Sequence, residues 1–249
     1  MNRVLLVFRR DYREMRSTAA FRIMVMVAAA ITAGASAGIS VALRLQPWYG
    51  EPEARPVLNV VMGLVSYFLP LIVLTAFIWA FASFSVVKEK VNGVIECLMA
   101  TPLGPKALLI GKGLAVFVPG YIISVIALGI FLLTVNLSVF LPGWHAFVLP
   151  GPAVVLGLVI NPLLFFCLLL LTILISLASN PDIAVGPSLI TGFGLLMGMP
   201  VGLVTGAIDI SSWSFVLWYL AATAVAWAVF LYLTRLLKRQ NIVLSSKGV

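Results

Sequence analysis

The sequence predicts an all-helical protein that crosses a membrane several times, and both composition and charge placement support this fold class. Of the 249 residues, 62% are hydrophobic and 10% are charged, whereas about a quarter of the residues in a soluble domain carry charge. The apolar residues form six long runs, and the basic residues behind the net charge of +8 gather at the ends of those runs. This placement is typical of a polytopic membrane protein. The sequence contains no basic or aromatic stripe that would bind nucleic acid, so we expect no nucleic-acid partner.

Residues 1–19 predict an interfacial amphipathic helix on the cytoplasmic surface of the lipid bilayer. One side of this helix is apolar and consists of Leu5, Phe8, Tyr12 and Met15. Arginine and acidic side chains occupy the other sides, and we expect the arginines to face anionic headgroups. Ser17 is a candidate N-cap for the next helix. The alternative is a basic tail that only sets the orientation of the chain.

A single transmembrane domain, residues 1–249, follows from the six apolar runs. The predicted spans cover residues 20–43, 57–87, 107–135, 153–179, 183–208 and 215–234. The second span is longer than the ~20 residues that a bilayer requires, so it should tilt or project beyond the membrane, and Pro70 predicts a kink in it. Pro119-Gly120 interrupts the third span, and residues 136–152 predict a hairpin at the outer surface.

Small residues recur at intervals of four in the first and fifth spans, a spacing that lets helix backbones approach closely. The predicted helix-packing residues are Gly34, Gly38, Gly194, Gly198, Gly202 and Gly206.

The distribution of basic residues predicts that both termini are cytoplasmic. With this orientation only Arg44 and Arg55 fall outside, and the remaining lysines and arginines lie on the inner side. The positive-inside rule favours this arrangement strongly over its reverse. We therefore expect a multi-pass protein of the cell (plasma) membrane.

Residues 88–106 form a charged segment between the second and third spans. Its apolar positions follow one helix face and are Val87, Val91, Val94, Ile95 and Leu98. Thr101 precedes Pro102, which disfavours helical geometry at Thr101, so this short helix should end there. A partly charged helix fixed by a stiff turn between two spans has a suitable form for receiving force from a soluble partner.

This segment resembles the cytoplasmic coupling helix of type-2 ABC exporter permeases, which sits in a groove of the ATPase subunit. The similarity is carried by Glu89-Lys90, Gly93, Ile95-Glu96, Leu98, Thr101-Pro102 and Gly111-Lys112. Ile95 departs from the leucine that is commoner in that family. Spacing alone favours a charged loop that only anchors two spans. The Thr-Pro and Gly-Lys pairs at the matching positions favour the coupling helix instead.

The resemblance implies a permease subunit that works as a homodimer or heterodimer with two soluble ABC ATPase subunits. The expected ATPase-coupling residues are Glu89, Val91, Gly93, Ile95, Glu96, Leu98, Thr101, Pro102 and Lys112. Closure of the ATPase pair on ATP would push on Glu89 to Pro102 and tilt the second and third spans. ATP and Mg would be bound by the partner, and this chain would bind no cofactor.

The sequence contains no recognisable catalytic or metal centre. A phosphate loop around Gly111-Lys112 fails because Lys106 replaces the first glycine and Gly113 replaces the serine or threonine. We therefore expect a transporter subunit rather than an enzyme, with Lys112 snorkelling to the inner surface. His145 is the only histidine and has no ligand neighbours in sequence. Cys97 and Cys167 predict no disulfide.

Mildly polar and flexible side chains in the second and fifth spans are candidates for a translocation pathway, although packing is the simpler role for most of them. They are Ser66, Tyr67, Phe68, Thr75, Thr191, Met197 and Met199. Titratable groups are scarce in the spans, which favours export of a lipophilic or amphiphilic substrate, such as a drug, lipid or peptide-like molecule. The alternatives are a sodium-ion or haem-maturation permease of related build, and a scaffold or assembly factor that transports nothing.

Overall fold

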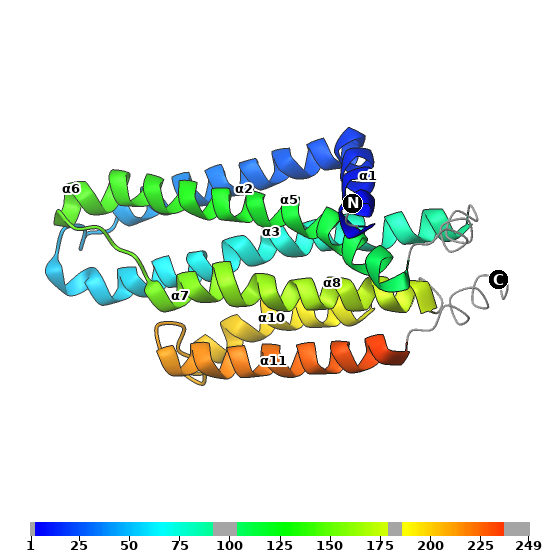
Figure 1. The fold of residues 1–249 in the computed structure, drawn as a ribbon. Helices are drawn as coiled ribbons and strands as arrows, with labels where there is room; N and C mark the ends of the chain where they lie inside the picture. Colours follow the sequence, from blue (N-terminus) through cyan, green and yellow to red (C-terminus); the bar gives the residue numbers. More distant parts are fainter. Residues whose placement is uncertain (1–2, 92–103, 179–185, 237–249) are drawn as a thin grey trace.

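The protein is a bundle of long helices with roughly parallel axes, crossed at one end by a shorter helix (Figure 1). The computed structural model describes residues 3–91, 104–178 and 186–236, and no strand occurs among them. The helices are α1 (Arg3–Ser17), α2 (Ala19–Arg44), α3 (Arg55–Val91), α5 (Pro105–Val135), α6 (Leu141–Trp144), α7 (Gly151–Val155), α8 (Asn161–Ala178), α10 (Gly186–Val204) and α11 (Trp213–Leu236). A 3₁₀ turn, η1 (Pro52–Ala54), precedes α3, and two π turns, η2 (Asn136–Phe140) and η3 (Leu156–Ile160), lie within longer helical stretches.

Five of these helical stretches are long and apolar enough to cross a membrane. They are Ala19–Arg44, Arg55–Phe81, Pro105–Trp144, Gly151–Ser176 and Trp213–Arg235. The predicted all-helical class is therefore confirmed, and the architecture is that of a multi-pass membrane protein. The predicted fifth span, 183–208, corresponds to a shorter apolar helix, Leu189–Val204. Gly206 lies beyond the end of α10 with φ 70°, a left-handed conformation that suits glycine in a turn.

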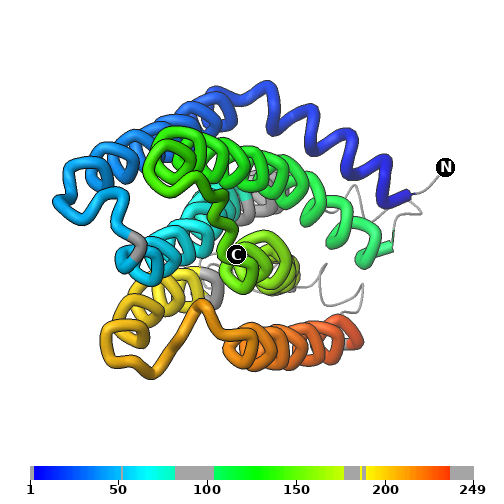
Figure 2. The backbone as a smooth tube through the Cα atoms, turned by 90° about the vertical axis from the view of Figure 1, so that its left-hand side faces the viewer, coloured from blue at the N-terminus to red at the C-terminus, as the bar shows by residue number. Residues whose placement is uncertain are grey.

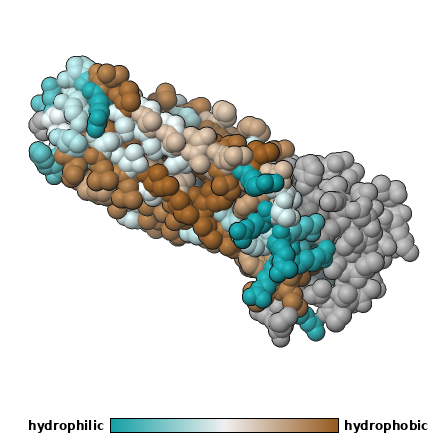
Figure 3. All heavy atoms as spheres, turned by 90° about the horizontal axis from the view of Figure 1, so that it is seen from above, coloured by the Kyte–Doolittle hydropathy of each residue, from teal (hydrophilic) through white to brown (hydrophobic). Residues whose placement is uncertain are grey.

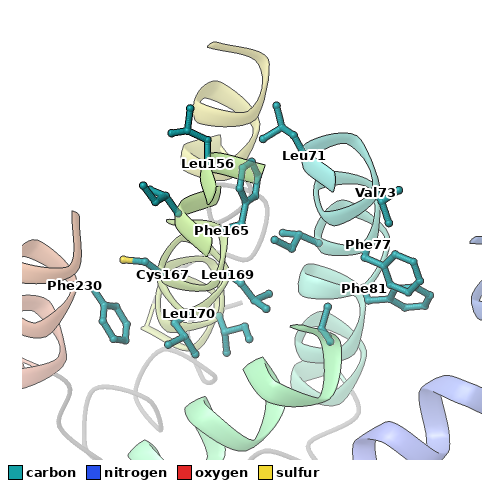
Figure 4. Packing of buried hydrophobic residues seen from close by; sticks show 14 of the residues in the cluster. Leu71, Val73, Phe77, Phe81, Leu156, Phe165, Cys167, Leu169, Leu170 and Phe230 are labelled. Atoms are coloured by element: carbon teal, nitrogen blue, oxygen red, sulfur yellow. The ribbon is translucent and has the colours of Figure 1, made fainter. Parts of the chain in front are cut away.

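Helices α3 and α8 form the centre of the bundle, and the other helices surround them (Figure 2). In their most apolar stretches, 56% of the residues of α3 and 67% of those of α7 to α8 are buried, against 22% for α2 and 17% for α11. Figure 4 shows Leu71 and Phe165 between the two central helices, and Phe230 of α11 on the opposite side of α8. Aliphatic and aromatic packing of this kind holds a helix bundle together where water is absent.

The bundle has two polar ends separated by an apolar band (Figure 3). We call them the α1 end and the α6 end. The α1 end contains α1, the beginnings of α2, α5 and α10, and the ends of α3, α8 and α11; the α6 end contains the connections between the opposite helix ends (Figure 1). The large exposed side chains in the band are mostly Leu, Val and Ile, as expected for a lipid-facing surface.

Both π turns are followed by a proline, and in each case the carbonyl that the proline leaves without a partner receives a hydrogen bond from another helix. Proline lacks an N–H, so Pro142 cannot bond to the carbonyl of Ser138, and Pro162 cannot bond to that of Leu158. The guanidinium of Arg44 donates from Nε (3.0 Å) and from Nη2 to the Ser138 carbonyl. The Tyr121 hydroxyl donates to the Leu158 carbonyl at 3.1 Å. Each π turn is thereby joined to a neighbouring helix.

Pro70 lies inside α3 and cannot donate to the carbonyl of Ser66, and this carbonyl lies at a very tight contact between the central helices. A Cβ at Gly157 would lie 2.3 Å from this oxygen and 3.4 Å from Cγ of Pro70. The absence of a side chain at Gly157 lets the two backbones meet, with a Cα hydrogen directed at the free carbonyl. Helix α3 continues through Pro70, and the predicted kink at this residue stays a prediction.

Three local predictions need correction. Pro119-Gly120 does not interrupt the third span, because α5 continues through it, and Gly120 instead accommodates Phe77 of α3, whose Cβ would lie 3.1 Å from an added Cβ. The outer hairpin is partly helical, since η2 and α6 extend the span to Trp144. The N-cap of α2 is Thr18 rather than Ser17, and its hydroxyl accepts from the Phe21 N–H at 3.3 Å.

Candidate coupling site at the junction of α1 and α5

The predicted coupling segment connects two helices that run without a break into the bundle. Helix α3 has 37 residues, of which Arg55–Phe81 form the apolar span, and it continues to Val91. At ~1.5 Å per residue the extension is about 15 Å long. Helix α5 begins at Pro105, with Gly104 as N-cap. A displacement of the segment would therefore reach both spans through continuous helix.

Helix α1 packs across the first turns of α5 at this end of the bundle (Figure 2). Val7, Asp11 and Met15 form its buried face. A Cβ on Gly111 would lie 2.7 Å from Cβ of Val7 and 3.1 Å from the carbonyl oxygen of Val4. Contacts below 3.0 Å are not tolerated by real side chains, so the glycine is required for this close crossing.

A buried ion pair joins the two helices beside that glycine. Lys112 Nζ donates to Asp11 Oδ2 at 3.1 Å, and the two side chains are only 3% and 9% exposed. Arg10 Nε lies 4.0 Å from the other carboxylate oxygen. Removing one member of a buried pair leaves an uncompensated charge and costs about 3–5 kcal/mol. The pair therefore fixes the position of α1 on α5.

This geometry corrects two expectations. Lys112 does not snorkel to the surface, because its ammonium group is enclosed by α1 and bonded to Asp11. The buried side of α1 includes Asp11 in place of Leu5, which is 47% exposed. Asp11 is buried because it pairs with Lys112, a residue distant in sequence on α5.

The contact between α1 and α5 is also connected to the first span, because α1 leads directly into α2. Thr18 alone separates α1 from α2, and its hydroxyl donates to the Met15 carbonyl at 2.7 Å while it caps α2. A joint of one residue with both of its hydrogen bonds made is short and stiff. The start of α5, α1 and the start of α2 thus form one connected unit.

The remaining predicted coupling residues lie mostly beyond the described part of the chain. Glu89 and Val91 belong to the last turns of α3. The others, Gly93, Ile95, Glu96, Leu98, Thr101 and Pro102, lie outside the described residues, and their predicted role stays a prediction.

The predicted pathway residues do not share one surface of the subunit. Ser66, Tyr67, Thr75 and Met199 are buried in the bundle, Phe68 and Thr191 are half-buried, and Met197 is 66% exposed. In this conformation Thr75 donates to the Leu71 carbonyl of its own helix at 2.7 Å. A route that uses these side chains needs a second subunit or another conformation.

The predicted packing glycines also divide into groups. Gly34, Gly38, Gly194 and Gly198 have open space where a Cβ would be, so none of the described helices packs on them. Gly202 faces Ile208, which follows it in the same chain, at 2.4 Å from an added Cβ. Their role in contacts between subunits stays a prediction.

The sequence reasoning missed Asp11 and Gly111 as site residues. A signal for Asp11 was present, since Val7, Asp11 and Met15 are spaced by four and share a helix face. An acid on the apolar face of a basic helix indicates a buried cationic partner. Gly111 was noted only as part of a motif.

Comparison with known proteins identifies no matching protein family, no similar characterised protein and no similar solved structure.

Proposed function

We propose that this chain is the transmembrane permease subunit of an ATP-driven exporter of the type-2 ABC class. It assembles with a second permease half and with a separate soluble ATPase, which binds ATP and Mg. Helix α10 forms the fifth of six spans, and both termini face the cytoplasm of a cell whose plasma membrane holds the complex.

The observation that carries this proposal is the burial of Lys112 against α1, in the first turns of α5 after the coupling segment. A loop that only anchors two spans has no need for an ion pair between its exit and the N-terminal helix. A segment that transmits force needs such a connection, because the force from the ATPase must reach several spans together. Here α1, α2 and α3 all contact α5, and Thr18 alone connects α1 to α2.

The distribution of charge favours a lipophilic or amphiphilic cargo. Within the five described spans, charged side chains lie only near the helix ends. A sodium route would place carboxylates or clustered oxygen ligands at mid-membrane, where each charge costs about 2.5–3.5 kcal/mol and is kept only for function.

The first experiment tests for the partner. The full chain is purified in mild detergent from its native membrane, and the copurifying proteins are identified. The proposal expects a soluble protein with ATP-hydrolysing activity, which cargo stimulates after reconstitution into liposomes. A scaffold or assembly factor would bring down no ATPase, and this outcome would reject the permease.

The second experiment tests the coupling segment. Replacement of Glu96 and Leu98 by alanine should leave insertion and assembly intact and abolish cargo-stimulated ATP hydrolysis. The matched control is Glu51→Ala with Leu45→Ala, at the α6 end, where both residues are exposed. Equal stimulation in the two double variants would show that the segment does not couple.

A further inference from the structure

We infer that the outward face of α1 is a binding surface for anionic phospholipid headgroups, and that headgroup binding holds the α1–α5 junction in place. The surface consists of Arg9, Arg13 and Arg16, with Leu5 and Leu6 among them. All five side chains are exposed.

The position of α1 places these arginines at headgroup level. Helix α1 runs across the bundle axis (Figure 1), so its whole length stays near one depth. Its last residue is joined through Thr18 to α2, and α2 shows its lipid-facing side from Ile23 onward, which is 53% exposed. The apolar band therefore begins within about two turns of α1, and Arg16 and Arg22 mark its border.

Because Asp11 is held in the ion pair on the buried side of α1, the outward face of α1 carries mainly positive charge and suits an anionic ligand. Asp11 is turned inward and bonded to Lys112, so its negative charge does not offset the arginines on the outward face. Glu14 is the only acid exposed among the described residues of α1. Guanidinium groups bind phosphate through paired N–H donors, a geometry that lysine lacks.

A membrane is a better partner for this face than a soluble protein. Leu5 and Leu6 are 47% and 44% exposed between arginines, and a helix that presents leucine together with arginine is built to enter the headgroup and acyl boundary. An acidic protein groove would neutralise the arginines but would leave leucines at the level of the bilayer surface unused.

Lipid binding has a consequence for the proposed coupling, and this step rests on the proposed function. The buried face of α1 is fixed to α5 beside the coupling segment, and its outward face is fixed to the membrane surface. An anchored α1 gives the start of α5 a support, so force from the ATPase tilts the spans instead of displacing α1. Anionic lipid should therefore raise cargo-stimulated ATP hydrolysis.

The binding experiment uses the purified full chain in a zwitterionic detergent. The thermal unfolding midpoint is followed while dioleoylphosphatidylglycerol or dioleoylphosphatidylcholine is titrated into the micelles. Phosphatidylglycerol should raise the midpoint at lower lipid fractions, and 0.5 M NaCl should reduce the difference. The double variant R9Q/R13Q should need roughly tenfold to thirtyfold more phosphatidylglycerol for half of the effect.

The matched control is R55Q/R235Q, which removes two exposed arginines from other helices and should titrate like the wild type. Equal midpoints of all proteins without lipid verify folding. Equal responses to the two lipids, or equal losses in both double variants, would overturn the lipid surface. An R9Q/R13Q variant that keeps its lipid response but no longer captures the ATPase would also overturn it, by assigning the face to a protein partner.

Measurement of ATP hydrolysis in nanodiscs of each lipid distinguishes the proposed permease function from the proposed lipid-binding surface. If no ATPase copurifies but the phosphatidylglycerol response depends on Arg9 and Arg13, the permease function fails and the lipid surface stands. If ATP hydrolysis is stimulated equally in nanodiscs of either lipid, the permease function stands and the supporting role of lipid is rejected.

Discussion

At the scale of single residues, the junction depends on two side chains of opposite charge and on the absence of a third side chain. Asp11 and Lys112 are both nearly enclosed and 3.1 Å apart, while Gly111 provides the space in which their helices meet. A buried pair of this kind contributes positional specificity more than net stability, since an apolar pair of similar volume packs about as well. The two contributions can be separated by mutation.

Lys112→Met should lower stability by about 3–5 kcal/mol, because Asp11 is left buried and unpaired. Combining it with Asp11→Leu should restore most of the loss, since the double variant buries only apolar groups. Thermal unfolding in detergent measures both, with the exposed Glu14→Gln as the control, expected within about 0.5 kcal/mol of the wild type. A Lys112→Met protein as stable as this control would refute the buried pair.

Gly111→Ala should destabilise the protein by about 1–3 kcal/mol, because the new methyl group overlaps Val7 and separates α1 from α5. Gly129→Ala in the same helix meets no atom within 4 Å and should be neutral or stabilising by up to about 1 kcal/mol. Unfolding midpoints of the two variants decide the question. Val7→Ala should partly rescue Gly111→Ala, and equal midpoints for the two glycine variants would contradict the close crossing.

At the scale of elements, two hydrogen bonds between helices lie where Pro142 and Pro162 interrupt the backbone hydrogen bonding of their own helices. The Ser138 carbonyl is bonded by Arg44, and the Leu158 carbonyl by Tyr121. In lipid no water can bond to a carbonyl that has lost its backbone donor, so a proline in a span leaves a carbonyl that needs a donor from a neighbouring helix. Through these bonds between helices, Pro142 and Pro162 contribute to the tertiary structure.

Tyr121→Phe should cost about 1 kcal/mol, because it removes the hydrogen bond to Leu158 and leaves that carbonyl bare. In a Pro162→Ala background the restored N–H can bond to the same oxygen, so the cost should nearly vanish. The double-mutant cycle, followed by thermal unfolding, measures this dependence. Tyr232→Phe at an exposed position serves as control, and independence of the two mutations would contradict the assignment.

At the scale of the whole molecule, the two polar ends differ in content. The α1 end carries the exposed arginines of α1 and both attachments of the coupling segment, whereas the α6 end carries the Arg44 and Trp144 contacts, including the bond from Trp144 Nε1 to the Glu51 carbonyl at 2.8 Å. The proposed function requires the α1 end to be cytoplasmic.

Cysteine labelling of intact cells tests this orientation. In a chain with Cys97→Ser and Cys167→Ala, Ser211→Cys at the α6 end should react with a membrane-impermeant maleimide, and Glu14→Cys at the α1 end should react only after permeabilisation. Both positions are exposed. Labelling of Glu14→Cys in intact cells would reverse the orientation and exclude contact with a cytoplasmic ATPase.

The sequence was sufficient for the fold class because hydropathy and charge at helix ends are local properties. The existence of α1 and of most long apolar helices followed from these properties, with most helix bounds within a few residues of those predicted. The inward turn of Asp11 and the continuity of α5 through Pro119 did not, since each depends on a partner in another helix. Of the site, Lys112 was predicted as a coupling residue, but its burial depends on Asp11, 101 positions away, and no local periodicity encodes such a contact.

The bonds to the proline-freed carbonyls also imply an order of assembly during synthesis. Arg44 precedes Ser138 and Tyr121 precedes Leu158 in the chain, so each donor is synthesised before its acceptor. The Ser66 carbonyl is the exception, because Gly157 emerges much later. A nascent chain that stops short of Gly157 lacks this contact, so its second span should be packed less firmly until the fourth span has been made.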